Sequence, residues 1–350
     1  MENDFSDRAK ADMARVNQVS PENSKTSEEL IAELIAEMEP LEKLRKRTLK
    51  KQNYGLLAGM LMSIPAMFMV SGVLGDGLWI LTGAVGMVVS AAVLFYSAYF
   101  VVRDFNVRYK MEVVQKLLKT RLENVRFEPY GNPEIARIFS QSGITQEYYE
   151  RLTVTDAING YYQGREVRIA EIRTEIAQRQ ENTNSRLPII RFQEVFRGIF
   201  VVAGPKQTVG SLIFVKTGQS KHKLLNAFDR MNKGDYLKDF FSGLKRAEIP
   251  DEEFNSVFYV MTSDEAAANR LLDYETRHRM VELRNRFVRG VEFAYTPASF
   301  ALSIKTDFDL FDTSLQRSLL EAKVLRRAID QLDELLALID TIGSRSDAPV

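Results

Sequence analysis

Hydrophobic residues are unevenly distributed along the chain, and their strongest concentration is a tract of 51 residues, 52–102, in which Asp76 is the single charge. A membrane hydrocarbon core about 30 Å thick needs about 20 apolar helical residues. Residues 54–74 and 78–102 supply two segments of that kind. The pattern therefore predicts a transmembrane helical hairpin over residues 53–102.

Small residues recur at helical spacing in both predicted spans. Such stripes let two helices approach closely in lipid, where burial of apolar surface gives no net drive for association. We expect them to pack within the hairpin, with dimerisation as the alternative. Because Asp76 is the one ionisable residue of the tract, a channel or proton relay is disfavoured and the hairpin is interpreted as an anchor. The predicted packing residues are Gly55, Gly59, Ser63, Gly83, Gly86 and Ser90.

The charges that flank the tract predict its orientation. Residues 1–42 contain eleven acidic and four basic side chains, and a basic cluster without acidic residues follows. Further basic residues follow the second span, whereas the turn between the spans has none. Lys and Arg concentrate on the cytoplasmic side, so both termini are predicted to be cytoplasmic. The cluster at the membrane interface comprises Lys43, Arg45, Lys46, Arg47, Lys50 and Lys51, and selective binding of an anionic lipid is its second interpretation.

Polar residues 1–25 are predicted to be disordered, and an amphipathic helix is predicted over 26–52. Its apolar stripe could dock on the soluble domain, lie on the membrane or pair with another chain. A juxtamembrane helix is expected over 103–125. These helices bracket the hairpin on both sides.

Residues 126–312 show strand-like runs interrupted by helical patterns, which predicts an α+β domain. The expected helices cover 133–143, where Asn132 can cap, and 223–241 and 264–287. The expected strands are 167–176, 198–203, 208–215, 257–261, 291–295 and 300–304, and the last two are expected to form a β-hairpin across residues 296–299.

The final segment, 313–343, has apolar residues at two heptad positions, including Leu315, Leu325 and Leu332. This spacing predicts a long amphipathic helix. It is compatible with a short coiled coil, and hence a homo-oligomer, and equally with docking on the strands of the same domain.

The sequence contains little that indicates chemistry. It has no cysteine and two histidines, His222 and His278, each flanked by cations and without a carboxylate partner in sequence. The common zinc, hydrolase and nucleotide motifs are absent, and Asp307, Asp309 and Asp312 lack the glycine and terminal glutamate of a calcium loop. We therefore expect no cofactor, no metal and no catalytic residue, and the zero net charge argues against nucleic acid.

Several short blocks are similar to those of an uncharacterised bacterial membrane family, domain of unknown function 3137. They are the Ser142-Gly143-Ile144 turn, Asp156 and Gly160, the block from Phe196 through Gly198 to Phe200, the block ending at Asp264, and Phe311. The similarity extends over about residues 100–315, except the segment after Gly204. It implies bacterial origin, a membrane location and a shared α+β domain, with no established activity. Physically, Gly198 fits a close approach or bulge in a strand, Phe196 and Phe200 fit the core, and Asp264 fits a helix cap.

The leading hypothesis is a two-span protein of the bacterial inner membrane that holds a cytoplasmic interaction or scaffold domain for other membrane or envelope proteins. An anionic-lipid-binding or sensing domain is the first alternative. In it, the basic cluster and the predicted loop lysines Lys206, Lys216, Lys221 and Lys223 would face anionic headgroups. A membrane-associated enzyme without a recognisable motif is the second.

Overall fold

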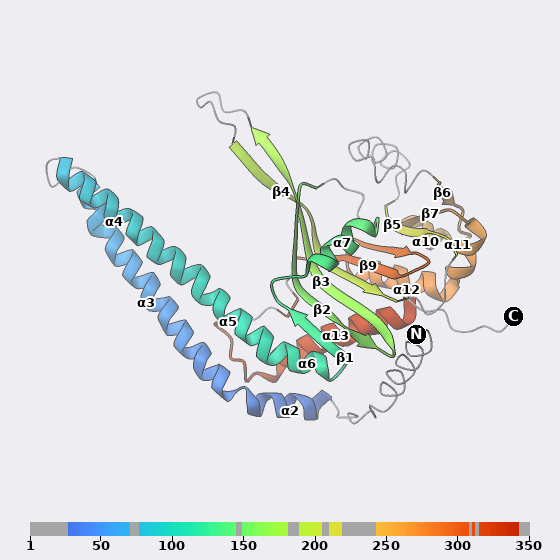
Figure 1. Ribbon diagram of the computed structural model, residues 1–350, viewed down its shortest axis with the longest axis horizontal. Coiled ribbons are helices and arrows are strands. Elements are labelled where there is room, and N and C mark those ends of the chain that lie inside the picture. Colours follow the sequence, from blue (N-terminus) through green and yellow to red (C-terminus); the bar gives the residue numbers. More distant parts are fainter. Residues whose placement is uncertain are drawn as a thin grey trace, which may run out of the picture.

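The computed structural model describes residues 27–70, 77–144, 149–180, 189–204, 210–218, 243–307, 310–311 and 315–342. A long helical hairpin projects from a body built of a β-sheet and helices (Figure 1). The N-terminal segment 1–25 and the helix expected over 223–241 lie outside the described residues.

The hairpin is made of two helical limbs. Helix α2 (Ser27–Glu37) leads into α3 (Glu39–Val70), which contains Pro65. The return limb is one uninterrupted succession of α4 (Gly77–Phe95), η1 (Tyr96–Phe100), α5 (Val101–Tyr109), η2 (Lys110–Val114) and α6 (Gln115–Lys119). Both limbs are long and apolar enough to cross a membrane, with mean hydropathy of 1.4 over the best window of Glu39–Val70 and 2.1 over that of Ile80–Lys119. Their apolar side chains are largely exposed, which supports membrane association.

Small residues hold the two limbs together. A Cβ at Gly83 would come within 2.6 Å of the Met69 Cβ, and one at Gly59 within 2.5 Å of the Leu94 Cγ. The Ser90 hydroxyl donates to the Gly59 carbonyl over 2.6 Å. Gly55 and Gly86 likewise lie against side chains of the opposite limb, at Ser97 and Ala66, whereas the Ser63 hydroxyl bonds within its own helix, to the Met60 carbonyl. For the four glycines and for Ser90, the structure therefore has the predicted packing within the hairpin.

This packing predicts a disulfide in the variant Ala66→Cys with Gly86→Cys. A Cβ at Gly86 lies 3.1 Å from the Ala66 Cβ, and a small relaxation reaches the ~3.8 Å that disulfides prefer. Because the chain has no native cysteine, oxidation of the full-length protein can form no other intramolecular disulfide. Mass spectrometry should find the two peptides linked. The control pair Ala66→Cys with Ala91→Cys, whose second position is exposed, should stay unlinked, and equal linkage of both pairs would contradict the packing.

The body is centred on a large antiparallel sheet. Within the described residues it has nine strands in the order β1-β2-β3-β4-β9-β8-β5-β7-β6. Together with the helices it confirms the α+β class. The strands are β1 (Glu123–Glu128), β2 (Arg151–Tyr162), β3 (Arg165–Gln180), β4 (Ile189–Ala203), β5 (Ile213–Thr217), β6 (Lys245–Ala247), β7 (Phe258–Thr262), β8 (Val291–Tyr295) and β9 (Phe300–Lys305).

The predicted strands differ from the observed ones mainly in the first half of the sheet. The hairpin of β8 and β9 is confirmed, with Tyr295 paired to Phe300. Strands β1, β2 and β6 are not among the predicted strands. In β2, a bulge at Asp156 interrupts the alternation of polar and apolar residues. Strands β3 and β4 are longer than predicted and continue to Gln180 and back to Ile189. The strand expected over 208–215 is β5, Ile213–Thr217.

Helices pack on both faces of the sheet. Helix α7 (Pro133–Gln141) matches its predicted cap, since the Asn132 side chain accepts from the Glu134 N–H. The single helix expected over 264–287 is two helices, because Asp273 caps a new start. Helices α10 (Glu252–Val257), α11 (Glu265–Leu271), α12 (Tyr274–Arg286) and α13 (Ala322–Ile342) complete the described body.

Helix α13 begins at Ala322 and not at residue 313, so Leu315 belongs to the preceding segment. The apolar stripe of α13, including Leu325, Leu332 and Ile339, is fully buried in the main core together with the stripe of α2. The domain-side end of the hairpin and one face of the sheet share this core, and a smaller core between α7 and the other face contains Phe139 and Phe200. Docking on the same chain therefore accounts for both amphipathic helices, and it leaves the α13 stripe no apolar surface for a coiled-coil partner.

Candidate functional site

Five of the six residues in the predicted basic cluster are exposed on α3, and Arg45 is the exception. Its guanidinium is buried and donates to the Glu42 carboxylate over 2.7 and 2.8 Å and to the Leu315 carbonyl. The Leu319 N–H in turn donates to Glu42 over 3.0 Å. Arg45 therefore fastens α3 to the segment before α13 and is not available to a lipid headgroup, which corrects its assignment to the membrane interface.

We call Glu42 and Arg45 with the backbone of Leu315 and Leu319 the latch. The hydrogen bond from Arg45 is the main reason that the pKa of Glu42 falls from its ordinary value of 4.5 to about 2. The same bond raises the pKa of Arg45. Both groups therefore stay charged at neutral pH, in a buried pair that also exchanges hydrogen bonds with the backbone of Leu315 and Leu319.

Aromatic side chains surround the return limb where its apolar stretch ends. Phe95, Tyr96 and Tyr99 are exposed, and the Arg103 guanidinium lies 4.9 Å from the centre of the Phe100 ring. Amphipathic aromatic rings and arginine are typical of the boundary between hydrocarbon and headgroups. Tyr54 is exposed on the facing limb, whereas the side chain of Trp79 and the tip residue Asp76 lie outside the described part.

The apolar hairpin continues into the body without a linker. Phe105, Tyr109 and Leu117 of the return limb are each at most 2% exposed and belong to the main core. Lys110, where the limb becomes π-helical, forms an ion pair with the buried Asp156 of β2. Hydrophobic packing and this ion pair therefore fix the direction of the hairpin relative to the sheet.

The six positions that carry the family resemblance have structural environments. Asp156 has φ of +50° at the β2 bulge, which brings its carboxylate to Lys110. Gly160 faces β1, where a Cβ would lie 3.2 Å from the Glu123 carbonyl oxygen. Gly198 lies against β9, and Asp264 caps α11 by accepting from the Ala267 N–H over 3.0 Å. Phe196 and Phe200 pack around Phe139 of α7 in the smaller core. None of these roles requires a ligand.

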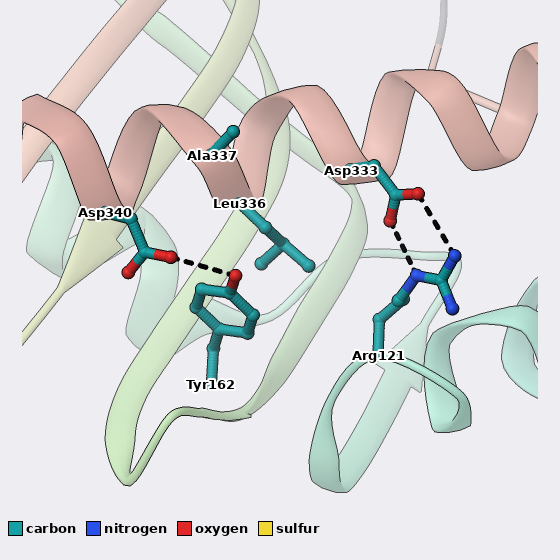
Figure 2. A pocket seen from close by; sticks show the side chains of 6 residues that line it. All are labelled: Arg121, Tyr162, Asp333, Leu336, Ala337 and Asp340. Atoms are coloured by element: carbon teal, nitrogen blue, oxygen red, sulfur yellow. Dashed lines mark hydrogen bonds and ion pairs between the residues drawn. The ribbon is translucent and has the colours of Figure 1, made fainter. Parts of the chain in front are cut away.

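One hollow of the described body lies beside α13 (Figure 2). It has a volume of about 430 Å³ and is lined by Arg121, Tyr162, Asp333, Leu336, Ala337 and Asp340. Arg121 follows α6 and forms a bidentate ion pair with Asp333 over 2.6 and 3.1 Å. Tyr162, at the end of β2, donates to Asp340 over 2.9 Å. The sequence reasoning missed this hollow, because its residues come from three distant segments without a shared motif.

The charged groups of this hollow are engaged with one another. The hydrogen bond to Asp333 raises the pKa of Arg121, and burial followed by the hydrogen bond to Asp340 raises the pKa of Tyr162. Tyr162 therefore stays protonated and is no general base at neutral pH. The arrangement fastens α13 to the sheet and can offer a polar recognition surface, but it activates no nucleophile.

A second hollow of about 500 Å³ lies on the other side of Ala337, between α12 and α13. Its lining combines charged residues, among them Arg279, Arg286 and Glu334, with the apolar Leu283, Ala337 and Leu338. No group of three His, Asp or Glu side chains placed to hold a metal occurs within the described ranges. His278 is half-exposed beside Glu282 on α12, and His222, Asp309 and Asp312 fall on undescribed positions.

Lys216 is a second residue whose environment the sequence did not reveal. Sequence reasoning places it with Lys206, Lys221 and Lys223 among loop lysines that could face lipid headgroups, whereas it lies in β5 and is 1% exposed. Its ammonium donates to the Glu292 carboxylate over 2.9 Å and to the carbonyls of Gly143 and Ile144 after α7. Lys216 thus links the C-terminal end of α7 to the sheet. The other three lysines lie outside the described residues.

Comparison with known proteins supports the family resemblance and adds no activity. The model of the family described as "Protein of unknown function (DUF3137)" matches residues 194–343. No curated protein matches the chain. Among solved structures, the mycobacterial trehalose monomycolate transport factor A, TtfA, is similar at 9% sequence identity, over 65% of this chain and 91% of that chain, with a TM-score of 0.30. A likeness at that level supports no conclusion about fold or function.

Proposed function

We propose that this chain, whose residues 194–343 match the model of the DUF3137 family of unknown function, is a membrane-anchored scaffold of the bacterial inner membrane. The hairpin crosses the bilayer, and both termini and the sheet body are cytoplasmic. The body offers its surface to other membrane or envelope proteins. Its activity is to hold partners at a set position and requires no cofactor.

The observation that carries this proposal is the continuity of the hairpin with the body. The return limb runs from Gly77 to Lys119 without interruption and is buried in the main core from Phe105 onwards. A tethered enzyme can work on a flexible linker, whereas this junction sets the orientation of the domain relative to the membrane. A rigid junction is useful where a partner protein must contact the domain at a defined height and angle relative to the membrane.

The charges near the hairpin support the cytoplasmic orientation. Lys43, Lys46, Arg47, Lys50 and Lys51 are exposed on α3, and Arg103 and Arg108 are exposed on α5. All lie at the body end of the hairpin, where the positive-inside rule places the cytoplasm. These exposed cations also favour the second candidate function, recognition of anionic lipids, because each one near the surface contributes about 1 kcal/mol of attraction.

Site-specific photo-crosslinking in native membranes tests the scaffold. A photoreactive amino acid would replace one exposed residue at a time: Tyr130 beside α7, Tyr274 on α12, or Val288 after α12. We expect at least one of these positions to give a discrete and reproducible protein adduct, whereas Val88 in the hairpin, which is 70% exposed, should give lipid adducts. If the three body positions give no protein adduct while Val88 reports lipid, the scaffold proposal is overturned.

A further inference from the structure

Strands β3 and β4 extend beyond the rest of the sheet as a two-stranded ribbon. Strand β2 pairs with β3 no further than Glu175, and β9 pairs with β4 only from Gly198 to Ala203. The pairing of β3 with β4 continues to Gln180 and Ile189. We call residues 176–180 and 189–193 the ribbon. Its five residues per strand at ~3.3 Å each extend it by roughly 17 Å.

One face of the ribbon is apolar and exposed. Ile190 and Phe192 are 53% and 49% exposed, and two residues apart on a strand they share a face. The Arg151 guanidinium lies 5.5 Å from the centre of the Phe192 ring. Arg191, between them in sequence, is exposed on the opposite face. An isolated two-stranded ribbon is marginally stable in water, so a surface that covers these apolar side chains would stabilise it.

The ribbon and the apolar hairpin project from the body toward the same side. In Figure 1 both extend toward the upper left, and the free end of the ribbon lies beyond the sheet in the direction of the hairpin tip. A surface that crosses the hairpin where its apolar stretch begins would therefore lie on the side of the body toward which the ribbon projects. The bilayer is the one surface that the hairpin already implies.

We propose that the ribbon is a second membrane contact, in which Ile190 and Phe192 enter the headgroup region of the leaflet that receives the hairpin while Arg151 and Arg191 meet anionic headgroups. This proposal rests on the membrane location proposed above. The hairpin and the ribbon then form two attachment points, which hold the body at a fixed tilt and prevent it from rotating about the hairpin axis.

Charge and backbone geometry limit the depth of this contact. The ribbon residues 176–180 and 189–193 include two arginines, Arg179 and Arg191, and no acidic residue, a balance that favours an anionic surface. Gln178 and Gln193 form a side-chain hydrogen bond across the ribbon on the face opposite Ile190 and Phe192, so one face of the ribbon is polar. Within the ribbon, the outer edges of β3 and β4 have no neighbouring strand in the described sheet. Backbone groups without such a partner are costly in hydrocarbon. The ribbon therefore enters the interface and does not span the bilayer.

Single-cysteine labelling of the full chain tests the ribbon directly, because the native chain has no cysteine. Phe192→Cys would carry an environment-sensitive fluorophore in nanodiscs of mixed neutral and anionic phospholipid, and lipids with quenchers at different depths would locate it. Two matched positions serve as controls: Met67→Cys in the hairpin, 64% exposed, and Tyr274→Cys on α12, 72% exposed. We expect quenching at interfacial depth for position 192, deep quenching for 67 and none for 274.

The outcomes separate this proposal from the membrane location. If position 67 is quenched deeply and position 192 behaves like 274, the ribbon proposal is overturned and the membrane location stands. If position 67 is not quenched, both fail. Shielding of position 192 from lipid and aqueous quenchers alike would mean contact with a second copy and would also overturn the proposal. Arg191→Gln should lower the ratio of docked to undocked ribbon about fivefold on anionic nanodiscs and have little effect on neutral ones.

Discussion

Replacing Gly198 with valine is expected to destabilise the body by more than ~4 kcal/mol, a large part of the stability of an ordinary domain. Gly198 is paired with Lys305 of β9, and a Cβ there would lie 2.9 Å from the carbonyl carbon of Ile304 and closer still to its oxygen. The obstacle is backbone, which cannot move aside as a flexible side chain can. Strands β4 and β9 would have to separate, and they connect the two halves of the sheet.

Gly204→Val is the matched control for this substitution. Gly204 directly follows the same strand, and a Cβ there would meet its nearest atoms at 3.9 Å, an ordinary contact distance. Thermal unfolding of the purified full-length proteins, followed by circular dichroism, should show a large decrease in melting temperature for Gly198→Val. The melting temperature of Gly204→Val should change little. Equal stability of the two variants would contradict the register of β4 and β9.

Gly198 also illustrates what the sequence can predict. Its block of aromatic, glycine and aliphatic residues identifies a strand in which one position needs close approach, and the structure has both the strand and the contact. Asn132, Asp264 and the hairpin glycines behave similarly, because caps and small-residue packing depend on neighbours in sequence or on helical spacing. Interactions that depend on residues close in sequence can therefore be predicted from the sequence.

The features that sequence reasoning missed depend on distant residues. In the sequence Arg45 resembles its basic neighbours, and only the fold places Leu315 against it. In the same way, Lys216 resembles a loop lysine, and only the fold places Glu292 beside it. The hollow beside α13 combines Arg121, Tyr162 and Asp333 from three segments. Strand β2 was lost for a different reason, since the positive φ at Asp156 breaks the alternation on which strand prediction relies.

Buried ion pairs occur where the hairpin meets the body. Lys110 with Asp156 joins the return limb to β2, and the Arg45–Glu42 pair within α3 joins that helix to the segment before α13 through hydrogen bonds to the backbone of Leu315 and Leu319. Such pairs add little net stability compared with apolar packing, but breaking one is costly because the remaining charge is left buried. They therefore specify a single arrangement of helices and sheet, as a scaffold with a fixed orientation requires.

Removing the latch arginine, Arg45→Ala, is expected to destabilise the protein at neutral pH by about 3 kcal/mol, because the buried Glu42 carboxylate loses its hydrogen-bonded cation and keeps only the exposed Lys46 ammonium at 3.7 Å. The effect should depend on pH. In the native protein the pKa of Glu42 is lowered from 4.5 to about 2, so the stability that the latch contributes is complete above pH 4.5 and is lost as pH falls toward 2. Arg45→Ala should lack this acid-linked loss, so the stability difference from the native protein should shrink between pH 4.5 and pH 2.

Two variants make this prediction specific to the latch. Lys43→Ala removes a neighbouring cation that is 69% exposed and 3.8 Å from Glu39, and it should change the free energy of unfolding by no more than about 0.5 kcal/mol. The double variant Glu42→Leu with Arg45→Met removes both charges and should recover most of the stability that Arg45→Ala loses. Chemical unfolding of each full-length protein across the acidic range measures these differences. An Arg45→Ala protein whose stability falls with pH as steeply as that of the native protein would show that Glu42 is not held by Arg45, and the junction would then depend on apolar packing alone.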